Sequence, residues 1–106
     1  MKSGSEILEE LASESGYQIR IAWFFLAMVE KLNENVHKPG WESCTLQYLS
    51  MRLSQEREEL RRAIERFAPA EEVTKEAADV ANFAMMIADR YRNQEHVREL
   101  AEKAGL

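Results

Sequence analysis

The chain has 106 residues, of which 45% are hydrophobic and 31% are charged, and its formal net charge is −5. This composition is typical of one small globular domain, and it excludes intrinsic disorder. The negative charge excludes binding to a nucleic-acid backbone, which requires a basic surface.

Apolar residues recur with helical spacing along the whole sequence, and no stretch alternates with the period of a strand. Pro39 and Pro69 mark breaks between helices. We therefore expect an all-α bundle of four to five helices in a single domain that spans residues 1–106. The expected helices cover residues 5–15, 17–35, 43–67, 70–92 and 93–105.

The second expected helix, residues 17–35, is apolar on more than one face and needs neighbours on two sides. It is either the central helix of the bundle or a helix that contacts another subunit. The second reading predicts an oligomer that assembles through its helices. The two apolar stripes are Ile21, Phe25, Met28 and Leu32, and Ala22, Leu26 and Val29.

The third expected helix carries a glutamate inside its apolar seam. The 3–4 spacing of the seam leaves one position between Leu53 and Leu60, and Glu56 fills it. Glu59 lies one turn further along the same rim. Such a position is costly for a carboxylate unless a cation meets it.

The fourth expected helix has a similar rim, formed by Glu76, Asp79 and Asn82. If the third and fourth helices pack antiparallel across the Pro69 turn, four carboxylates meet in one small space, where they repel one another. A divalent cation removes this conflict, and ligands that are all oxygen favour Mg²⁺, with Mn²⁺ also possible. The predicted metal ligands are Glu56, Glu59, Glu76 and Asp79.

The two acidic pairs form a larger pattern: Glu56-x-x-Glu59, sixteen intervening residues, then Glu76-x-x-Asp79. This pattern resembles that of the MazG-like, all-α nucleoside triphosphate pyrophosphohydrolases. The resemblance extends to "KEAADVANFAMMIAD", and "MVEKLNENVHKPGW" looks like a stretch of the short, single-domain members. Together these segments cover roughly residues 24–90.

The resemblance implies hydrolysis of a (deoxy)nucleoside triphosphate between its α and β phosphates, which yields a nucleoside monophosphate and pyrophosphate. It implies bound Mg²⁺, with Glu56 and Glu59 as catalytic residues and Glu56 as the group that orients the attacking water. It also implies a homodimer or homotetramer. The residues implied to face the substrate are Lys31, Asn35, Lys38, Trp41 and Asn82. Trp41 is either a platform for the base or a plug at the end of the bundle.

A non-catalytic alternative stays open, in which the chain is an acidic helical module that dimerises or binds a partner helix. It accounts for the amphipathic helices and the charge, but it gives no reason for Glu56 to interrupt a seam. Cys44 is the one cysteine, so the expected location is the reducing cytoplasm. The apolar run 21–29 is far shorter than the ~20 residues of a membrane span, and we expect neither a membrane partner nor an export signal.

Overall fold

A computed structural model describes residues 1–14, 16–35 and 40–106 of the chain. These residues form helices and turns, with no strand among them, which confirms the prediction of an all-α fold. No helix in the described ranges is long and apolar enough to cross a membrane. The helices are α1 (Gly4–Glu14), α2 (Gly16–Glu34), α3 (Leu46–Glu65) and α4 (Ala70–Lys103), with a short 3₁₀ turn η1 (Trp41–Ser43) before α3.

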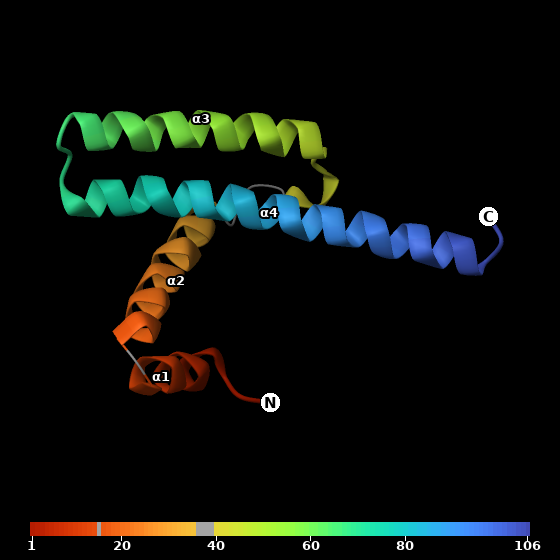
Figure 1. Cartoon of the computed structure of the whole chain (residues 1–106), viewed down its shortest axis with the longest axis horizontal. Coiled ribbons are helices and arrows are strands. Elements are labelled where there is room, and N and C mark those ends of the chain that lie inside the picture. Colours follow the sequence, from red (N-terminus) through yellow and green to blue (C-terminus); the bar gives the residue numbers. More distant parts are fainter. Residues whose placement is uncertain (15, 36–39) are drawn as a thin grey trace.

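Helices α3 and α4 form an antiparallel hairpin, as expected from the acidic rims (Figure 1). Thr45 caps the start of α3, because its hydroxyl accepts a hydrogen bond from the Tyr48 amide at 3.0 Å. At the other end the amides of Phe67 and Ala68 donate back to Ile64 and Ala63, and this closes the helix before Pro69. The tight turn fixes the register in which the two acidic rims face each other.

Helix α2 packs on α4 and not on α3, so α4 is the central helix of the described structure. Helix α1 folds back along α2 and contacts no other described helix (Figure 1). The predicted break of α4 near Asn93 is wrong, since a single helix runs through this position to Lys103. Asparagine costs a helix only about 0.7 kcal/mol relative to alanine, and no glycine or proline follows until Gly105. The last part of α4 therefore extends beyond the end of α3.

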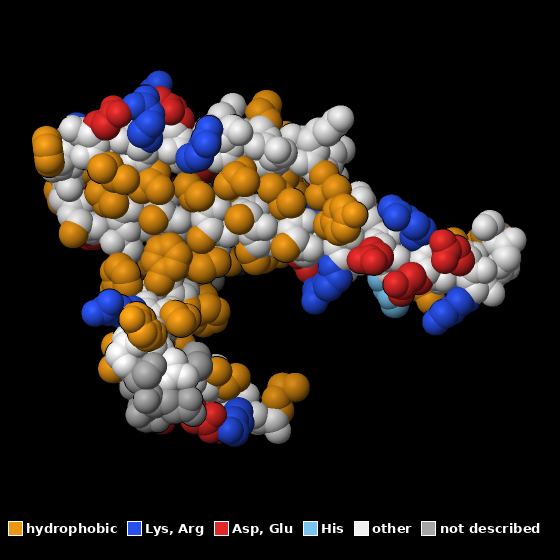
Figure 2. Space-filling model, viewed as in Figure 1, with side chains coloured by type: hydrophobic (Ala, Val, Ile, Leu, Met, Phe, Trp, Pro, Cys, Tyr) orange, Lys and Arg blue, Asp and Glu red, His pale blue; other side chains and the backbone are white. Residues whose placement is uncertain are grey.

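The core of this arrangement is small. Among the side chains that the structure describes, the buried apolar ones are Ala22, Leu49, Ala63 and Ala78, and only Leu49 is large. Hydrophobic side chains instead run along the α3–α4 hairpin and over α2 on the surface (Figure 2). Each predicted apolar stripe of α2 is partly open to solvent, with exposed fractions of 48% for Phe25 in the first and 49% for Leu26 in the second, although Ala22 of the second stripe is buried.

Candidate metal centre

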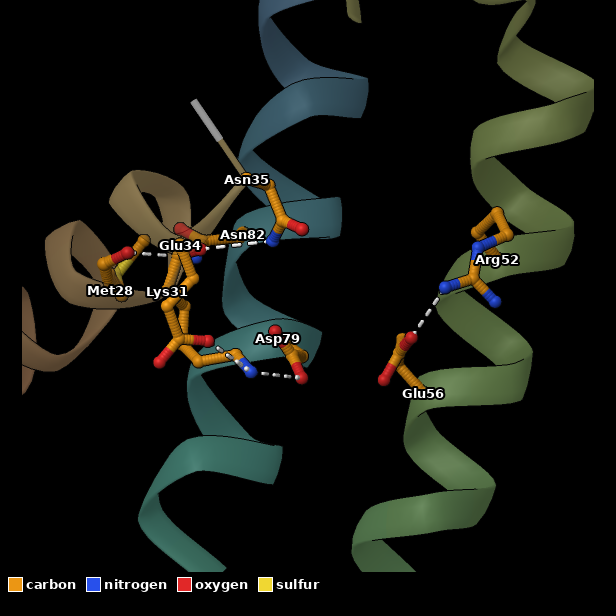
Figure 3. A network of polar contacts seen from close by, with 8 residues as sticks. All are labelled: Met28, Lys31, Glu34, Asn35, Arg52, Glu56, Asp79 and Asn82. Atoms are coloured by element: carbon orange, nitrogen blue, oxygen red, sulfur yellow. Dashed lines mark hydrogen bonds and ion pairs between the residues drawn. The ribbon is translucent and has the colours of Figure 1, made fainter. Parts of the chain in front are cut away.

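Three carboxylates from the two helices of the hairpin meet between α3 and α4. Glu56 of α3 and Glu76 and Asp79 of α4 each offer an oxygen atom, and these atoms lie within 4.8 Å of one another. Figure 3 shows Glu56 and Asp79 on facing sides of the hairpin. We call these three residues the acid cluster. The sequence prediction that the two acidic rims face each other is thus realised for three of the four carboxylates.

Glu56 is the most enclosed member of the acid cluster, with an exposed fraction of 5%. Its Oε1 accepts a hydrogen bond from Arg52 Nη2 at 2.7 Å, and the two groups form an ion pair (Figure 3). The other oxygen, Oε2, is buried and has no hydrogen-bond partner in the described structure. A buried polar atom without a partner is costly, and a cation or a water bound to Oε2 would remove this cost.

Arg52 is a part of the site that the sequence interpretation missed. It lies one turn before Glu56 and its guanidinium also stacks over the Phe83 ring, 5.0 Å from the ring centroid. A cation four residues before a buried carboxylate is a recognisable helical signal. The ring of Phe83 on α4 limits the positions that the guanidinium can take, and Arg52 bonds to Oε1 of Glu56.

The pKa of each member of the acid cluster lies above its ordinary value. Burial raises the pKa of Glu56 to about 7, and the carboxyls of Glu59 and Asp79 add to the effect while Arg52 opposes it. The pKa values of Glu76 and Asp79 also lie above their usual range, in both cases chiefly through burial. Without a bound cation, the folded chain therefore holds these groups in an environment that disfavours their ionised form.

Lys31 brings a second cation to the cluster from α2. Its Nζ lies 3.5 Å from Asp79 Oδ2 and 3.1 Å from Glu34 Oε2 (Figure 3). Burial lowers the pKa of Lys31, but the two carboxylates outweigh it and the net shift is upward. Lys31 is therefore charged at neutral pH, and its contact with a substrate stays a prediction.

Glu59 lies at the edge of the acid cluster. It is exposed, and its oxygens are not among those that lie within 4.8 Å of one another. Its carboxyl is nevertheless close enough to raise the pKa values of Glu56 and Glu76. It can reach a metal only through a change of side-chain conformation or through a bound water.

Asn82 is buried one turn beyond Asp79, with an exposed fraction of 3%. Its amide nitrogen donates a hydrogen bond to the Met28 carbonyl at 3.0 Å and so fastens α2 to α4 (Figure 3). Its Oδ1 is buried without a partner in the described ranges. The amide thus has a structural contact on one side and a free acceptor on the other.

The remaining substrate-facing candidates lie apart from the acid cluster or outside the described residues. Asn35 donates to the backbone carbonyl of Lys31 at 3.1 Å, so its side chain turns back on its own helix. The indole nitrogen of Trp41 donates to Asp89 Oδ2 at 2.9 Å, ten residues beyond Asp79 on α4. This contact suits the alternative in which Trp41 closes one end of the bundle. Lys38 lies outside the described residues.

The donor set of the acid cluster fits a hard divalent cation. Its ligands are carboxylate oxygens, and Glu56 and Glu76 each keep one buried oxygen without a partner among the described residues. Arg52 and Lys31 bring two positive charges to four neighbouring carboxylates. The negative charge that is left over, together with the free oxygens, could hold a divalent cation.

Comparison with known proteins identified no relative. No protein-family model matches the sequence, and no curated protein or solved structure is significantly similar to the chain. The resemblance to the MazG-like enzymes therefore rests on the motif residues alone.

Proposed function

We propose that the chain is a metal-dependent nucleoside triphosphate pyrophosphohydrolase of MazG-like type. The observation that supports this best is the acid cluster, in which buried Glu56 has one oxygen without a partner among the described residues and offers an oxygen within 4.8 Å of oxygens of Glu76 and Asp79. The spacing of these acids matches the motif of that enzyme class. The reaction releases pyrophosphate and a nucleoside monophosphate from a ribo- or deoxyribonucleoside triphosphate.

In this proposal Glu56, Glu76 and Asp79 hold Mg²⁺ or Mn²⁺, with Glu59 as a further ligand. When bound, the metal neutralises phosphate charge and lowers the pKa of a coordinated water. Glu56 would orient the attacking water toward the α phosphorus and would accept its proton.

Two features of this chain suit those roles. Glu56 is buried, and its Oε2 has no partner among the described residues, so this oxygen is available to a cation or to a water bound to it. Lys31 lies beside Asp79 and is free to exchange part of its carboxylate contact for a phosphate oxygen.

The reaction is tested by incubating the purified protein with each of the eight standard ribo- and deoxyribonucleoside triphosphates and Mg²⁺. Ion-exchange chromatography then resolves the products. We expect monophosphate and pyrophosphate in equal amounts, and a loss of at least 100-fold in kcat for Glu56→Gln and Asp79→Asn. Glu102→Gln, a change on an exposed face of α4, is the matched control and keeps full activity. Orthophosphate as the only product, or activity that survives in both site variants, contradicts the proposal.

We further propose that the working form is a homodimer or homotetramer in the cytoplasm. The accessible surface of the chain is 8162 Å², whereas a compact monomer of 12.3 kDa exposes about 6,100 Å². The radius of gyration of 17.0 Å also exceeds the roughly 13 Å of a compact domain of this length. The excess of roughly 2,000 Å² per chain is what protomers of obligate oligomers bury.

The non-catalytic helical module is the second candidate, and the exposed apolar surface of α2 favours it equally well. Thermal unfolding with and without Mg²⁺ separates the two. A native metal site raises the melting temperature, through about 2.7 kcal/mol of stabilisation at a metal concentration a hundredfold above Kd. A melting temperature that neither Mg²⁺ nor Mn²⁺ changes, with nucleotide present, favours the module.

A further inference from the structure

A groove of about 400 Å³ lies between α2 and the first turns of α4. Its α2 wall includes Trp23, Leu26 and Lys31, and its α4 wall includes Thr74 and Lys75. This volume is within the range of small-molecule pockets. Trp23 is 58% exposed, and its ring centroid lies 6.2 Å from that of Phe24, with the two rings tilted by 48°.

One end of the groove adjoins the acid cluster. Lys31 is part of the groove wall, and its Nζ is 3.5 Å from Asp79 Oδ2 (Figure 3). Thr74 and Lys75 directly precede Glu76 in the sequence. Trp23 lies eight residues before Lys31, or about 12 Å along the helix axis. A ligand can therefore span from the indole to the carboxylates.

The charges in the groove determine which end of such a ligand lies beside Trp23. Both lysines already face carboxylates, with Lys31 at 3.1 Å from Glu34 and Lys75 at 3.7 Å from Glu71. Glu30 adds a further negative charge to the wall. The groove by itself thus does not attract a polyanion, and an uncharged aromatic group is the better occupant of its Trp23 end.

We propose that Trp23 is the platform on which the base of the nucleoside triphosphate stacks, with the phosphates directed along Lys31 toward the acid cluster. This inference rests on the proposed function and adds to it the residue that binds the base. Trp23 contacts the base and not the reacting phosphates, so it governs substrate binding while the chemical step depends on the carboxylates.

The steady-state kinetics of Trp23→Leu, Trp23→Phe and Phe25→Leu test the assignment. Stacking on an aromatic side chain is worth a factor of roughly 5 to 150 in binding. We expect Trp23→Leu to raise KM by such a factor with kcat changed by less than about threefold. Trp23→Phe recovers most of the affinity. Phe25, which is 48% exposed on α2 but outside the groove, is the matched control, and its variant keeps the wild-type KM.

Inhibition by inorganic tripolyphosphate distinguishes base contacts from phosphate contacts. This ligand has no base, so its inhibition constant stays within about twofold of wild type in Trp23→Leu. An unchanged KM in Trp23→Leu, or an equal loss of affinity for nucleotide and tripolyphosphate, overturns the inference. A change of oligomeric state without a change of KM also overturns it, because Trp23 then belongs to a subunit contact.

Tryptophan emission provides a readout that does not depend on turnover. With Ca²⁺ in place of Mg²⁺, nucleotide quenches the emission of the wild type, and Trp23→Phe, which keeps Trp41, loses this quenching. Quenching without hydrolysis under Mg²⁺ contradicts the proposed reaction but supports the base platform. Hydrolysis with no quenching contradicts the platform alone, and the absence of both contradicts both.

Discussion

At the scale of the residue, Glu56 occupies a position where leucine would complete the seam of α3, and its burial has a measurable cost. The folded state raises its pKa from 4.5 to about 7. Between these values the folded chain binds a proton that the unfolded chain has released. The stability of the metal-free protein therefore falls as the pH rises through this interval.

We predict that the free energy of unfolding in the presence of EDTA is lower at pH 8 than at pH 5, by up to about 3 kcal/mol. Glu76 and Asp79 act in the same direction, since their pKa values are raised too. Urea denaturation at one protein concentration measures the difference, and Glu56→Gln flattens it. Mg²⁺ is expected to restore stability at pH 8 more than at pH 5, because protons compete with the metal at the lower pH. If the free energy of unfolding depends on pH equally in Glu56→Gln and in the wild type, other groups cause the pH dependence.

Phe67 stores strain of another kind at the turn between α3 and α4. Its φ is +55°, a conformation that favours glycine, and its side chain is 94% exposed. The left-handed conformation costs a residue with a side chain roughly 1–2 kcal/mol, and a glycine at this position avoids that cost. Glycine also has more conformational freedom in the unfolded chain, which offsets part of the stabilisation.

We therefore predict that Phe67→Gly stabilises the protein by about 0.5–1 kcal/mol. Equilibrium unfolding in urea measures the change. Phe67→Ala is the control, because it removes the ring and keeps the strain, so it brings no comparable gain. A destabilised Phe67→Gly would mean that the exposed ring has a partner, such as a second copy of the chain.

At the scale of the element, α4 combines two different parts. Its first half contacts α3 and α2 and carries Glu76, Asp79 and Asn82. Its last part is exposed, with exposed fractions of 64% at Val97 and 52% at Leu100. Figure 1 shows this part extending alone beyond the hairpin. An isolated helix of about 12 residues is only marginally stable in water.

Removal of residues 93–106 is therefore expected to change the free energy of unfolding by less than about 0.5 kcal/mol and to leave nucleotide turnover intact. Urea denaturation and the nucleotide assay measure both quantities. A loss of more than about 1 kcal/mol, or a smaller assembly in sedimentation, would show that another copy covers this part of α4.

At the scale of the whole molecule, the apolar surface is too large for the core. The buried apolar residues among those described are mostly alanines, while α2 exposes large side chains on both flanks. Ile21 and Phe25 lie on the flank away from the groove, with exposed fractions of 60% and 48%. Burial of two such side chains contributes about 1.5–3 kcal/mol each.

We predict that the double variant Ile21→Glu and Phe25→Glu shifts the protein from oligomer to monomer, as measured by analytical ultracentrifugation. Arg20→Glu, an exposed change on the same helix, is the control and leaves the mass unchanged. A wild type that sediments as a 12.3 kDa monomer over the whole concentration range would contradict the proposed assembly.

Much of the site could be predicted from spacing alone. Two acidic pairs at i, i+3 on successive helices, joined by a turn at Pro69, place Glu56 opposite Asp79 once the hairpin closes. The outward position of Glu59 could not be predicted. Glu56 and Glu59 differ by only about 60° around the helix axis, and the spacing of apolar residues does not locate the edge of the buried face that finely. The continuation of α4 past Asn93 was also not predicted, because the low helix propensity of one asparagine is weak evidence for the end of a helix.

The sequence by itself determined the helical class and the acidic pairs of the hairpin, because helical periodicity and i, i+3 spacing are local properties of the chain. Only the tertiary structure decided which cations meet those acids and where a groove forms. Lys31 reaches Asp79, and Trp23 lines the groove, because Asn82 fastens α2 across α4. A crossing of two helices distant in sequence depends on packing between them, and no local pattern specifies it.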